Sequence, residues 1–248
     1  MQYIEESNLF CFTIIGPETD IHDRLHYHSL FAMLQEAACL DAAHHGFGSD
    51  KMDELNVCWL LLRMKVKMDK IPKWKDKIYI RTWSCGFTKV FFNREFDIFD
   101  SDMRSIGWAS SVWIIAEQGD HRPVRPQTIE GMEIYASDGT KEGRKVDKIR
   151  AFVPDPESDK PLLVKFADYS EIDRNRHVNN TRYIAWSADA FYAEEDDERA
   201  ITELTVNYSS EVKAGEEILI YRNKKENVVT IDGYEKSGGR HVFSTEIT

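Results

Sequence analysis

The sequence predicts an α+β fold made of two similar halves, and three observations support this prediction. Each half contains one long helical pattern. Each pattern is followed by several short segments that alternate apolar and polar residues, as half-buried strands do. A stretch poor in apolar residues, 136–160, separates the halves as a linker would. We therefore expect one domain over 1–135 and another over 161–248, each with a long helix wrapped by a curved antiparallel sheet.

The first half begins its helical pattern with SLFAMLQEAACLDAAHHG (29–46) and ends it at Gly46 and Gly48. Alternation and β-branched or aromatic residues mark the strands that follow. These are WLLLRMKVKM (59–68), KIYIRTW (77–83), KVFFNREFDIF (89–99) and SSVWIIA (110–116). The sequence therefore predicts one helix and then several antiparallel strands in this half.

The second half repeats that order of elements. NTRYIAWSADAFYAEE (180–195) has a helical pattern. The predicted strands after it are ITELTVNYSSEV (201–212), EEILIYRN (216–223), NVVTIDGYE (227–235) and HVFSTEIT (241–248). The repeat is one of element order, because few residues match between the halves.

The composition limits the classes of partner and location. The net charge is −11, which argues against binding to nucleic acid. No apolar run approaches the roughly 20 residues that cross a membrane. The start, MQYIEESNLFCF, lacks the layout of a secretory signal or a transit peptide. We therefore expect a cytoplasmic protein without a membrane span.

Basic residues are concentrated in two places in this acidic chain. Seven of them and only two acidic residues lie between Arg63 and Lys77. A second group consists of Arg174, Arg176 and Arg182. These residues form either a solvated surface or a docking patch for an acidic partner.

The most informative motif is DRNRHVNN (173–180). It places a carboxylate at Asp173, a carboxamide at Asn175 and an imidazole at His177. In an extended backbone, residues two apart point to the same side, so we expect the three to converge. Such a set suits the hydrolysis of an acyl group and needs no metal and no cofactor. Asn179 or Asn180 is suited to cap the helix that follows, whose N-terminal N–H groups would favour an oxyanion.

The first half differs at the positions that correspond to this motif. Two Asp-Arg pairs, Asp23-Arg24 and Asp173-Arg174, suggest an offset of 150 residues between the halves. At that offset Leu25, Tyr27 and Ser29 lie opposite Asn175, His177 and Asn179. We therefore expect the chemistry in the second half alone, and an apolar ligand or simple packing in the first.

A group of histidines in the first half is a candidate metal site. His22, His26 and His28 lie close in sequence with Asp23. Their spacing does not match that of a metal site closely, so we expect no bound metal.

Five segments, taken in order, resemble the acyl-acyl-carrier-protein (acyl-ACP) thioesterases. They are residues 71–83, 91–100, 108–126, 173–186 and 207–218. The resemblance implies two tandem hotdog folds in one chain and hydrolysis of fatty acyl-ACP, which ends chain elongation in fatty acid biosynthesis. It also implies a catalytic set of Asp173, Asn175, His177 and Glu211. Many plant members carry a cysteine directly after the glutamate, whereas this chain has Val212, so a cysteine nucleophile at that position is excluded.

Each member of the implied set has a suitable role in thioester hydrolysis. Glu211 is the preferred general base for an attacking water. Asn175 and His177 can polarise the carbonyl or hold the water. Asp173 is the orienting partner of one of them, with direct nucleophilic attack as the alternative.

The implied substrate predicts two further surfaces. An acyl carrier protein is acidic, so the basic groups are candidate docking residues. These candidates are Lys65, Lys67, Arg174, Arg176 and Arg182. The acyl tunnel is expected along the first helix and strand. Its candidate lining residues are Met33, Leu34, Ala37, Leu40, Trp59 and Leu61.

Two alternative functions and the assembly stay open at this point. An acyl-CoA thioesterase would use the same site chemistry on another carrier. A non-catalytic acyl-binding hotdog regulator would not need Glu211. Either a monomer or a homodimer fits, because two hotdogs in one chain already supply the pairing that single hotdogs obtain by dimerising.

Overall fold

The computed structural model describes residues 2–4, 8–132, 143–155, 157–196 and 198–248. Two compact units make up the chain, Met1–Val146 and Asp147–Thr248. The division falls inside the stretch 136–160 that the sequence predicts as a linker. Of that stretch, 136–142 and 156 lie outside the described residues. The predicted boundaries at 135 and 161 stay predictions.

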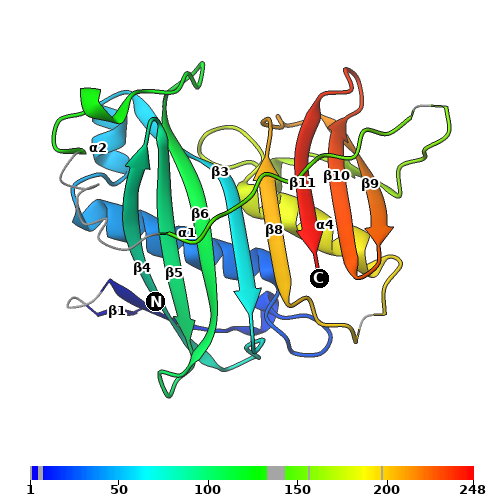
Figure 1. Ribbon diagram of the computed structural model, residues 1–248, viewed down its shortest axis with the longest axis horizontal. Helices are drawn as coiled ribbons and strands as arrows, with labels where there is room; N and C mark the ends of the chain where they lie inside the picture. The colour runs from blue at the N-terminus through cyan, green and yellow to red at the C-terminus, as the bar shows by residue number, and fades with distance from the viewer. Residues whose placement is uncertain (1, 5–7, 133–142, 156, 197) are drawn as a thin grey trace. The chain divides into compact units, whose positions relative to one another are not determined.

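The first unit is an antiparallel sheet packed against one long helix (Figure 1). Its sheet has the strand order β1-β2-β4-β5-β6-β3. The strands are β1 (Gln2–Ile4), β2 (Leu9–Thr13), β3 (Val57–Met68), β4 (Lys77–Thr88), β5 (Phe91–Phe99) and β6 (Ser105–Glu117). The helices are η1 (Gly16–Glu18), α1 (Tyr27–His44), α2 (Ser49–Glu54) and η2 (Pro126–Thr128). Helix α1 begins two residues before the predicted pattern and ends before Gly46, whose φ of 82° suits glycine.

The second unit has the same architecture. Its sheet has the order β8-β11-β10-β9-β7. The strands are β7 (Leu163–Phe166), β8 (Glu203–Tyr208), β9 (Glu217–Lys225), β10 (Val228–Glu235) and β11 (His241–Ile247). The helices are η3 (Tyr169–Glu171) and α4 (Asn180–Tyr192). The predicted strand 201–212 is too long, because β8 ends at Tyr208 and residues 209–216 form a loop.

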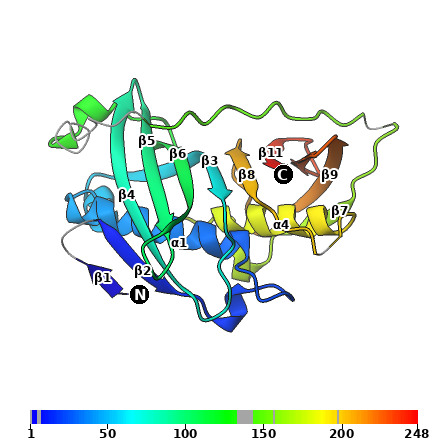
Figure 2. The same cartoon turned by 60° about the horizontal axis from the view of Figure 1, so that its bottom comes forward.

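Apart from β1, the strand orders of the two units correspond. The series β2-β4-β5-β6-β3 matches β7-β9-β10-β11-β8, and each long helix lies across its own sheet (Figure 2). All strand pairs within each unit are antiparallel. The predicted α+β class and the repeated order of elements are therefore confirmed.

The inner face of the first sheet packs against α1. Alternate residues of the central strands, such as Ile80, Phe96 and Ile98, are fully buried, as are Leu34 and Ala37 of the helix. Burial of this apolar area is the main source of stability for such a layer.

One buried ion pair crosses the same layer. Arg94 Nη1 on β5 lies 2.6 Å from Asp41 Oδ2 on α1 and donates to the Thr82 hydroxyl at 3.1 Å. Both charged side chains are almost fully buried, so removal of either one would leave an unpaired charge in the core.

The described part of the predicted linker is bound to the outer face of each sheet. In the first unit, the Arg144 N–H and guanidinium donate to the Glu95 carboxylate on β5. In the second, the Phe152 N–H donates to Asp232 Oδ2 on β10 at 3.3 Å. Because β5 and β10 are equivalent strands, the two units hold this segment in the same way, through a buried carboxylate.

Within the described residues, the structure contains no helix with the length and apolar character that a membrane span requires.

We predict that Arg144→Ala destabilises the protein most at neutral pH. Burial raises the pKa of Glu95, while hydrogen bonds from Ser110 and Arg144 oppose this shift. The variant leaves the buried, ionised Glu95 carboxylate with fewer hydrogen-bond donors, which lowers the unfolding free energy by roughly 1–3 kcal/mol. Because Arg144 is partly exposed, water can take its place and reduce this loss. As the pH falls through the raised pKa, Glu95 takes up a proton and the cost disappears.

Urea denaturation of both proteins at neutral and at mildly acidic pH measures this difference. An equal loss of unfolding free energy at both pH values would contradict an electrostatic origin. Arg122→Ala is a matched control, because its partner Asp120 is exposed.

Candidate active site

The polar motif forms a tight turn. The Asp173 N–H donates to the His177 carbonyl at 2.9 Å, and the Arg176 N–H donates to the Asp173 carbonyl at 3.0 Å. Arg176 has a φ of 66°, and an antiparallel bridge between Ile172 and Val178 closes the turn. The predicted extended backbone over 173–177 is therefore wrong, and side-chain alternation does not align the three polar residues.

Asp173 orders this turn through its side chain. Its Oδ1 accepts a hydrogen bond of 2.8 Å from the Asn175 main-chain N–H. Carboxylates commonly stabilise turns in this way. Asp173 therefore orients the backbone of Asn175, whose own side chain is exposed.

His177 and Glu211 lie side by side although they are distant in sequence. His177 Nε2 is 3.4 Å from Glu211 Oε2, and their side chains are 19% and 40% exposed. The next residue on each segment explains the proximity, because the Val178 N–H donates to the Val212 carbonyl at 2.8 Å. Both valines are buried, so this main-chain bond anchors the pair of functional groups.

Helix α4 begins directly after the turn. Asn179 is its N-cap, and the Asn179 Oδ1 accepts hydrogen bonds from the Thr181 N–H and hydroxyl. The main-chain carbonyl of Asn180 accepts a hydrogen bond from the Tyr208 hydroxyl at 3.1 Å. Stabilisation of an oxyanion at this helix end stays a prediction.

A buried tyrosine near Glu211, Tyr183, is not predicted from the sequence. Tyr183 on α4 is 2% exposed and makes edge contacts with the rings of Trp186, Tyr208 and Phe243. Burial raises its pKa, and the nearby Glu211 carboxylate raises it further. Its place one helical turn after Asn180 is the signal that could have identified it.

The candidate docking residues differ in their surroundings. Arg174 and Arg176 are exposed on the turn, and Lys67 is exposed on β3 of the first unit. Lys65 is half-buried. Arg182 is bound by Glu171, whose Oε1 accepts hydrogen bonds from its Nε and Nη2 at 3.2 Å each.

The first unit contains the same turn with different side chains. The Asp20 N–H donates to the Arg24 carbonyl, Asp20 Oδ1 accepts the His22 N–H at 2.9 Å, and Asp23 has a φ of 61°. A bridge between Thr19 and Leu25 matches the one between Ile172 and Val178, which gives an offset of 153 residues.

The predicted offset of 150 is therefore wrong. His22, Arg24 and His26, not Leu25, Tyr27 and Ser29, occupy the positions equivalent to Asn175, His177 and Asn179. The cause is the coincidental repeat of an Asp-Arg pair, while the backbone hydrogen bonds define the true register.

The equivalent of the glutamate is apolar. The Leu25 N–H donates to the Pro72 carbonyl at 2.8 Å, as the Val178 N–H does to that of Val212. Ile71 consequently takes the place of Glu211, so the first unit has no carboxylate at this point of the fold.

The histidines of the first turn do not gather as metal ligands. The rings of His26 and His28 are stacked with centroids 4.8 Å apart. Among the residues that the structure describes, His22, His26, His28 and Asp23 form no group whose ligand atoms are close enough to share an ion.

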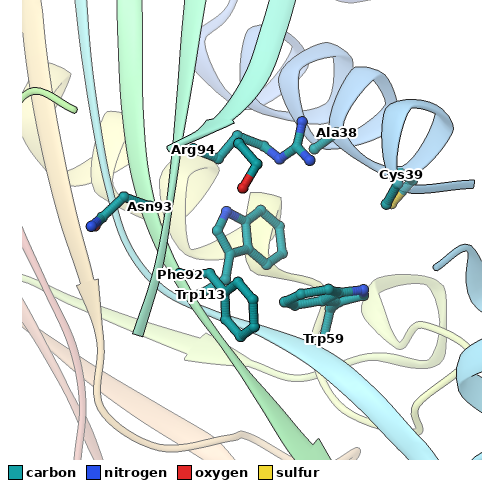
Figure 3. Close-up of a pocket in the computed structure, with 9 residues that line it drawn as sticks. Ala38, Cys39, Trp59, Phe92, Asn93, Arg94 and Trp113 are labelled. Atoms are coloured by element: carbon teal, nitrogen blue, oxygen red, sulfur yellow. The ribbon is translucent and has the colours of Figure 1, made fainter. Parts of the chain in front are cut away.

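An apolar pocket lies between α1 and the sheet of the first unit (Figure 3). Its lining residues are Ala38, Cys39, Ala42, Trp59, Ser84, Phe92, Asn93, Arg94 and Trp113. Of the six predicted tunnel residues, all of which are described, only Trp59 lines this pocket. Met33, Leu34, Ala37 and Leu61 are buried elsewhere in the core, and Leu40 is half-buried.

Comparisons with known proteins agree on one family. Residues 11–132 match the family model for the N-terminal domain of acyl-ACP thioesterases, and residues 154–244 match that for the C-terminal domain. Oleoyl-acyl carrier protein thioesterase 2 of Arabidopsis thaliana is 27% identical over 81% of this chain and 58% of its own length. A palmitoyl-acyl carrier protein thioesterase of the same plant is 28% identical over 67% and 41%. The chain spans about half the length of these curated relatives.

Solved structures resemble almost the whole chain. A crystal structure of an acyl-ACP thioesterase from Bacteroides thetaiotaomicron has a TM-score of 0.84 and 26% identity, with 96% of each chain covered. The 12:0-ACP thioesterase from Umbellularia californica has a TM-score of 0.80 and 18% identity, with 99% and 98% covered, which supports the fold alone. These likenesses confirm the predicted fold of two tandem hotdog units.

We predict that Asn179→Ala lowers the unfolding free energy by about 1 kcal/mol. The substitution removes the oxygen that caps the Thr181 N–H. Asn179→Asp retains an acceptor and should restore most of the loss. Asn180→Ala is the matched control, because the Tyr208 hydroxyl contacts only the main chain of that residue.

Thermal or urea denaturation measures the three variants. If Asn179→Ala and Asn180→Ala lose the same unfolding free energy, the capping role of Asn179 is wrong.

Proposed function

Because the chain belongs to the acyl-ACP thioesterase family, we propose that it hydrolyses the thioester of fatty acyl-ACP and releases free fatty acid. The observation that best supports this activity is the pairing of His177 with Glu211 at 3.4 Å beside the N-terminus of α4. A carboxylate and an imidazole in contact supply both a proton acceptor and a donor.

In the proposed reaction, Glu211 acts as the general base. It takes a proton from a water molecule, whose oxygen attacks the thioester carbonyl carbon. The carbonyl oxygen becomes an oxyanion, and the N–H donors of His177 and Asn175 are suited to stabilise it. Collapse of this intermediate breaks the C–S bond, and the thiolate of the phosphopantetheine arm leaves with the proton that Glu211 took from the water, which restores the carboxylate. The reaction needs no metal and no cofactor.

Asp173 acts as an orienting residue in this proposal. Its carboxylate accepts the Asn175 N–H, which fixes the turn that carries Asn175 and His177. Because Asp173 Oδ1 already accepts this hydrogen bond, we favour an orienting role for Asp173 over nucleophilic attack.

The pocket of the first unit is our proposed site for part of the acyl chain. Trp59, Phe92 and Trp113 give it aromatic walls, and Ala38 and Ala42 leave room beside α1 (Figure 3). An apolar pocket of this kind binds a hydrocarbon chain through burial of its surface.

The proposed partner is an acyl carrier protein. Exposed Arg174 and Arg176 lie on the turn that carries Asn175 and His177, and a positive field there would attract an acidic carrier. A cytoplasmic location and the choice between monomer and homodimer stay predictions.

We predict that Glu211→Gln or His177→Ala lowers kcat for acyl-ACP by roughly 100- to 10,000-fold, because each removes a group that transfers or directs a proton. Release of free thiol measures the rate. Glu226→Gln, at an exposed glutamate in the β9–β10 turn, is the control and should retain full activity.

Circular dichroism distinguishes loss of activity from loss of the fold. Full activity in a folded variant would remove that residue from the mechanism.

We predict that reversing Lys65, Lys67 and Arg176 to Glu raises KM for acyl-ACP by roughly tenfold, because electrostatic attraction of the carrier is lost. Hydrolysis of a small uncharged thioester should change little. The same reversal at exposed Lys51 on α2 is the control.

Steady-state kinetics on the substrates separates docking from chemistry. An equal loss on acyl-ACP and on the small thioester would contradict a docking role. A preference for acyl-CoA in the unaltered protein would instead support the alternative of an acyl-CoA thioesterase.

A further inference from the structure

The loop that carries Glu211 makes main-chain hydrogen bonds to neighbouring segments before and after that residue. It covers residues 209–216, between β8 and β9. The Val212 carbonyl accepts the Val178 N–H, and the Gly215 N–H donates to the Ala167 carbonyl at 2.9 Å. The Ser209 and Ser210 N–H groups also donate to the Val242 carbonyl on β11, at 2.8 and 3.1 Å. The carbonyl of Glu211, between these bonds, is bound by a side chain.

Arg240 binds two residues of this loop, Glu211 and Glu216. Its Nη1 donates to the main-chain carbonyl of Glu211. Its Nη2 donates to both oxygens of Glu216, at 3.1 and 2.9 Å. Glu216 Oε2 also accepts the Lys213 N–H at 2.9 Å. The forked guanidinium thus joins the first and last residues of the segment 211–216.

Arg240 itself comes from an ordered turn. It directly precedes β11, and its carbonyl accepts the Glu235 N–H at 2.9 Å. The Glu235 carboxylate accepts the N–H groups of Ser237 and Gly238 at 2.6 and 2.8 Å. The β10–β11 turn is therefore fixed before the arginine side chain reaches across to the loop.

The first unit provides an internal comparison for this contact. Its equivalent loop is closed in the same way, because the Lys73 N–H donates to Asp76 Oδ2 at 2.9 Å. Its equivalent turn is one residue shorter but is closed by the same bond, because the Asp100 N–H donates to the Arg104 carbonyl at 2.9 Å, and Arg104 directly precedes β6 as Arg240 precedes β11. Arg104 is therefore the counterpart of Arg240.

The two arginines differ in what they bind. Arg104 Nη1 pairs with Asp102 at 2.7 Å, and its side chain is 75% exposed, against 37% for Arg240. Within the described residues, Arg104 makes no hydrogen bond or ion pair to residues 71–76. The same loop is thus formed in the first unit without an arginine contact. The contact is present where the loop carries a glutamate and absent where Ile71 stands in its place.

We propose that Arg240 is a positioning residue for Glu211. By binding the Glu211 carbonyl, it fixes the backbone from which the carboxylate reaches His177. This inference rests on the proposed function, because it assigns Arg240 a role through the general base of that reaction. A shift of about 1 Å in a reacting group can lower a rate about 100-fold, so a defined loop path matters for catalysis.

The test compares Arg240→Ala with Arg104→Ala, the equivalent substitution in the first unit. Arg240→Ala should lower kcat for acyl-ACP about 10- to 100-fold with little change in KM. Added guanidinium ion should restore part of kcat in this variant, because it can refill the vacated site. Arg104→Ala should keep the kcat of the unaltered protein and should not respond to guanidinium. An unchanged kcat in Arg240→Ala would overturn the proposal, and so would equal losses in the two variants.

A second variant covers the case in which Arg240→Ala does not fold. Glu216→Gln keeps an acceptor for the Lys213 N–H but removes the charge that binds the guanidinium. It should lower kcat several-fold at unchanged KM, and an unchanged kcat in the folded variant would overturn the proposal.

Amide hydrogen exchange separates this inference from the proposed function. In Arg240→Ala, the amides of residues 211–216 should exchange faster than in the unaltered protein, whether or not the chain hydrolyses acyl-ACP. If the unaltered protein releases no thiol, the proposed function is wrong, and the assignment of Arg240 to catalysis is overturned with it. If thiol is released but neither exchange nor kcat changes in the variant, only the role of Arg240 is wrong.

Discussion

A single main-chain hydrogen bond, from the Val178 N–H to the Val212 carbonyl, determines the geometry of the site. Both residues are buried, at 3% and 0% exposure, so loss of the bond would leave unsatisfied polar groups and cost roughly 1–3 kcal/mol. Because His177 and Glu211 each directly precede one of these valines, the bond brings them within 3.4 Å. The Asp173 turn, the Asn179 cap and the Arg240 contact fix the segments on either side of it.

The same bond occurs in both units, but only one unit has the complete set of chemical groups. In the first unit, Leu25 and Pro72 make the equivalent contact, and Ile71 lies where the second unit has Glu211. The scaffold therefore does not itself specify chemistry, which depends on a few side chains placed on it. The first unit instead has an apolar pocket beside α1, which suits an acyl chain. The proposed division of roles, with chemistry in the second unit and an acyl chain in the first, follows from the repeated fold and the unequal polar residues of the two halves.

Periodicity predicted the long helices and most strands, because α1, α4 and the central strands each bury one regular face. The resemblance supplied Glu211, which no local pattern near His177 indicates.

Three expectations failed for physical reasons. Residues 173–177 form a turn because the Asp173 carboxylate binds a backbone N–H nearby. The strand after α4 ends at Tyr208 and not at residue 212. The offset between the units is 153, because it is defined by equivalent backbone bridges and not by the repeated Asp-Arg pair. The contacts of Arg240 and Tyr183 join residues that are distant in sequence, which periodicity does not encode.

The most direct test of the account is the release of free thiol from a purified acyl-ACP by the unaltered protein, followed across acyl chains of graded length. The account predicts many turnovers per protein molecule, with free fatty acid and free thiol formed in equal amounts and a preference for certain chain lengths. Binding of acyl-ACP without release of thiol at any chain length would contradict it and would indicate an acyl-binding protein.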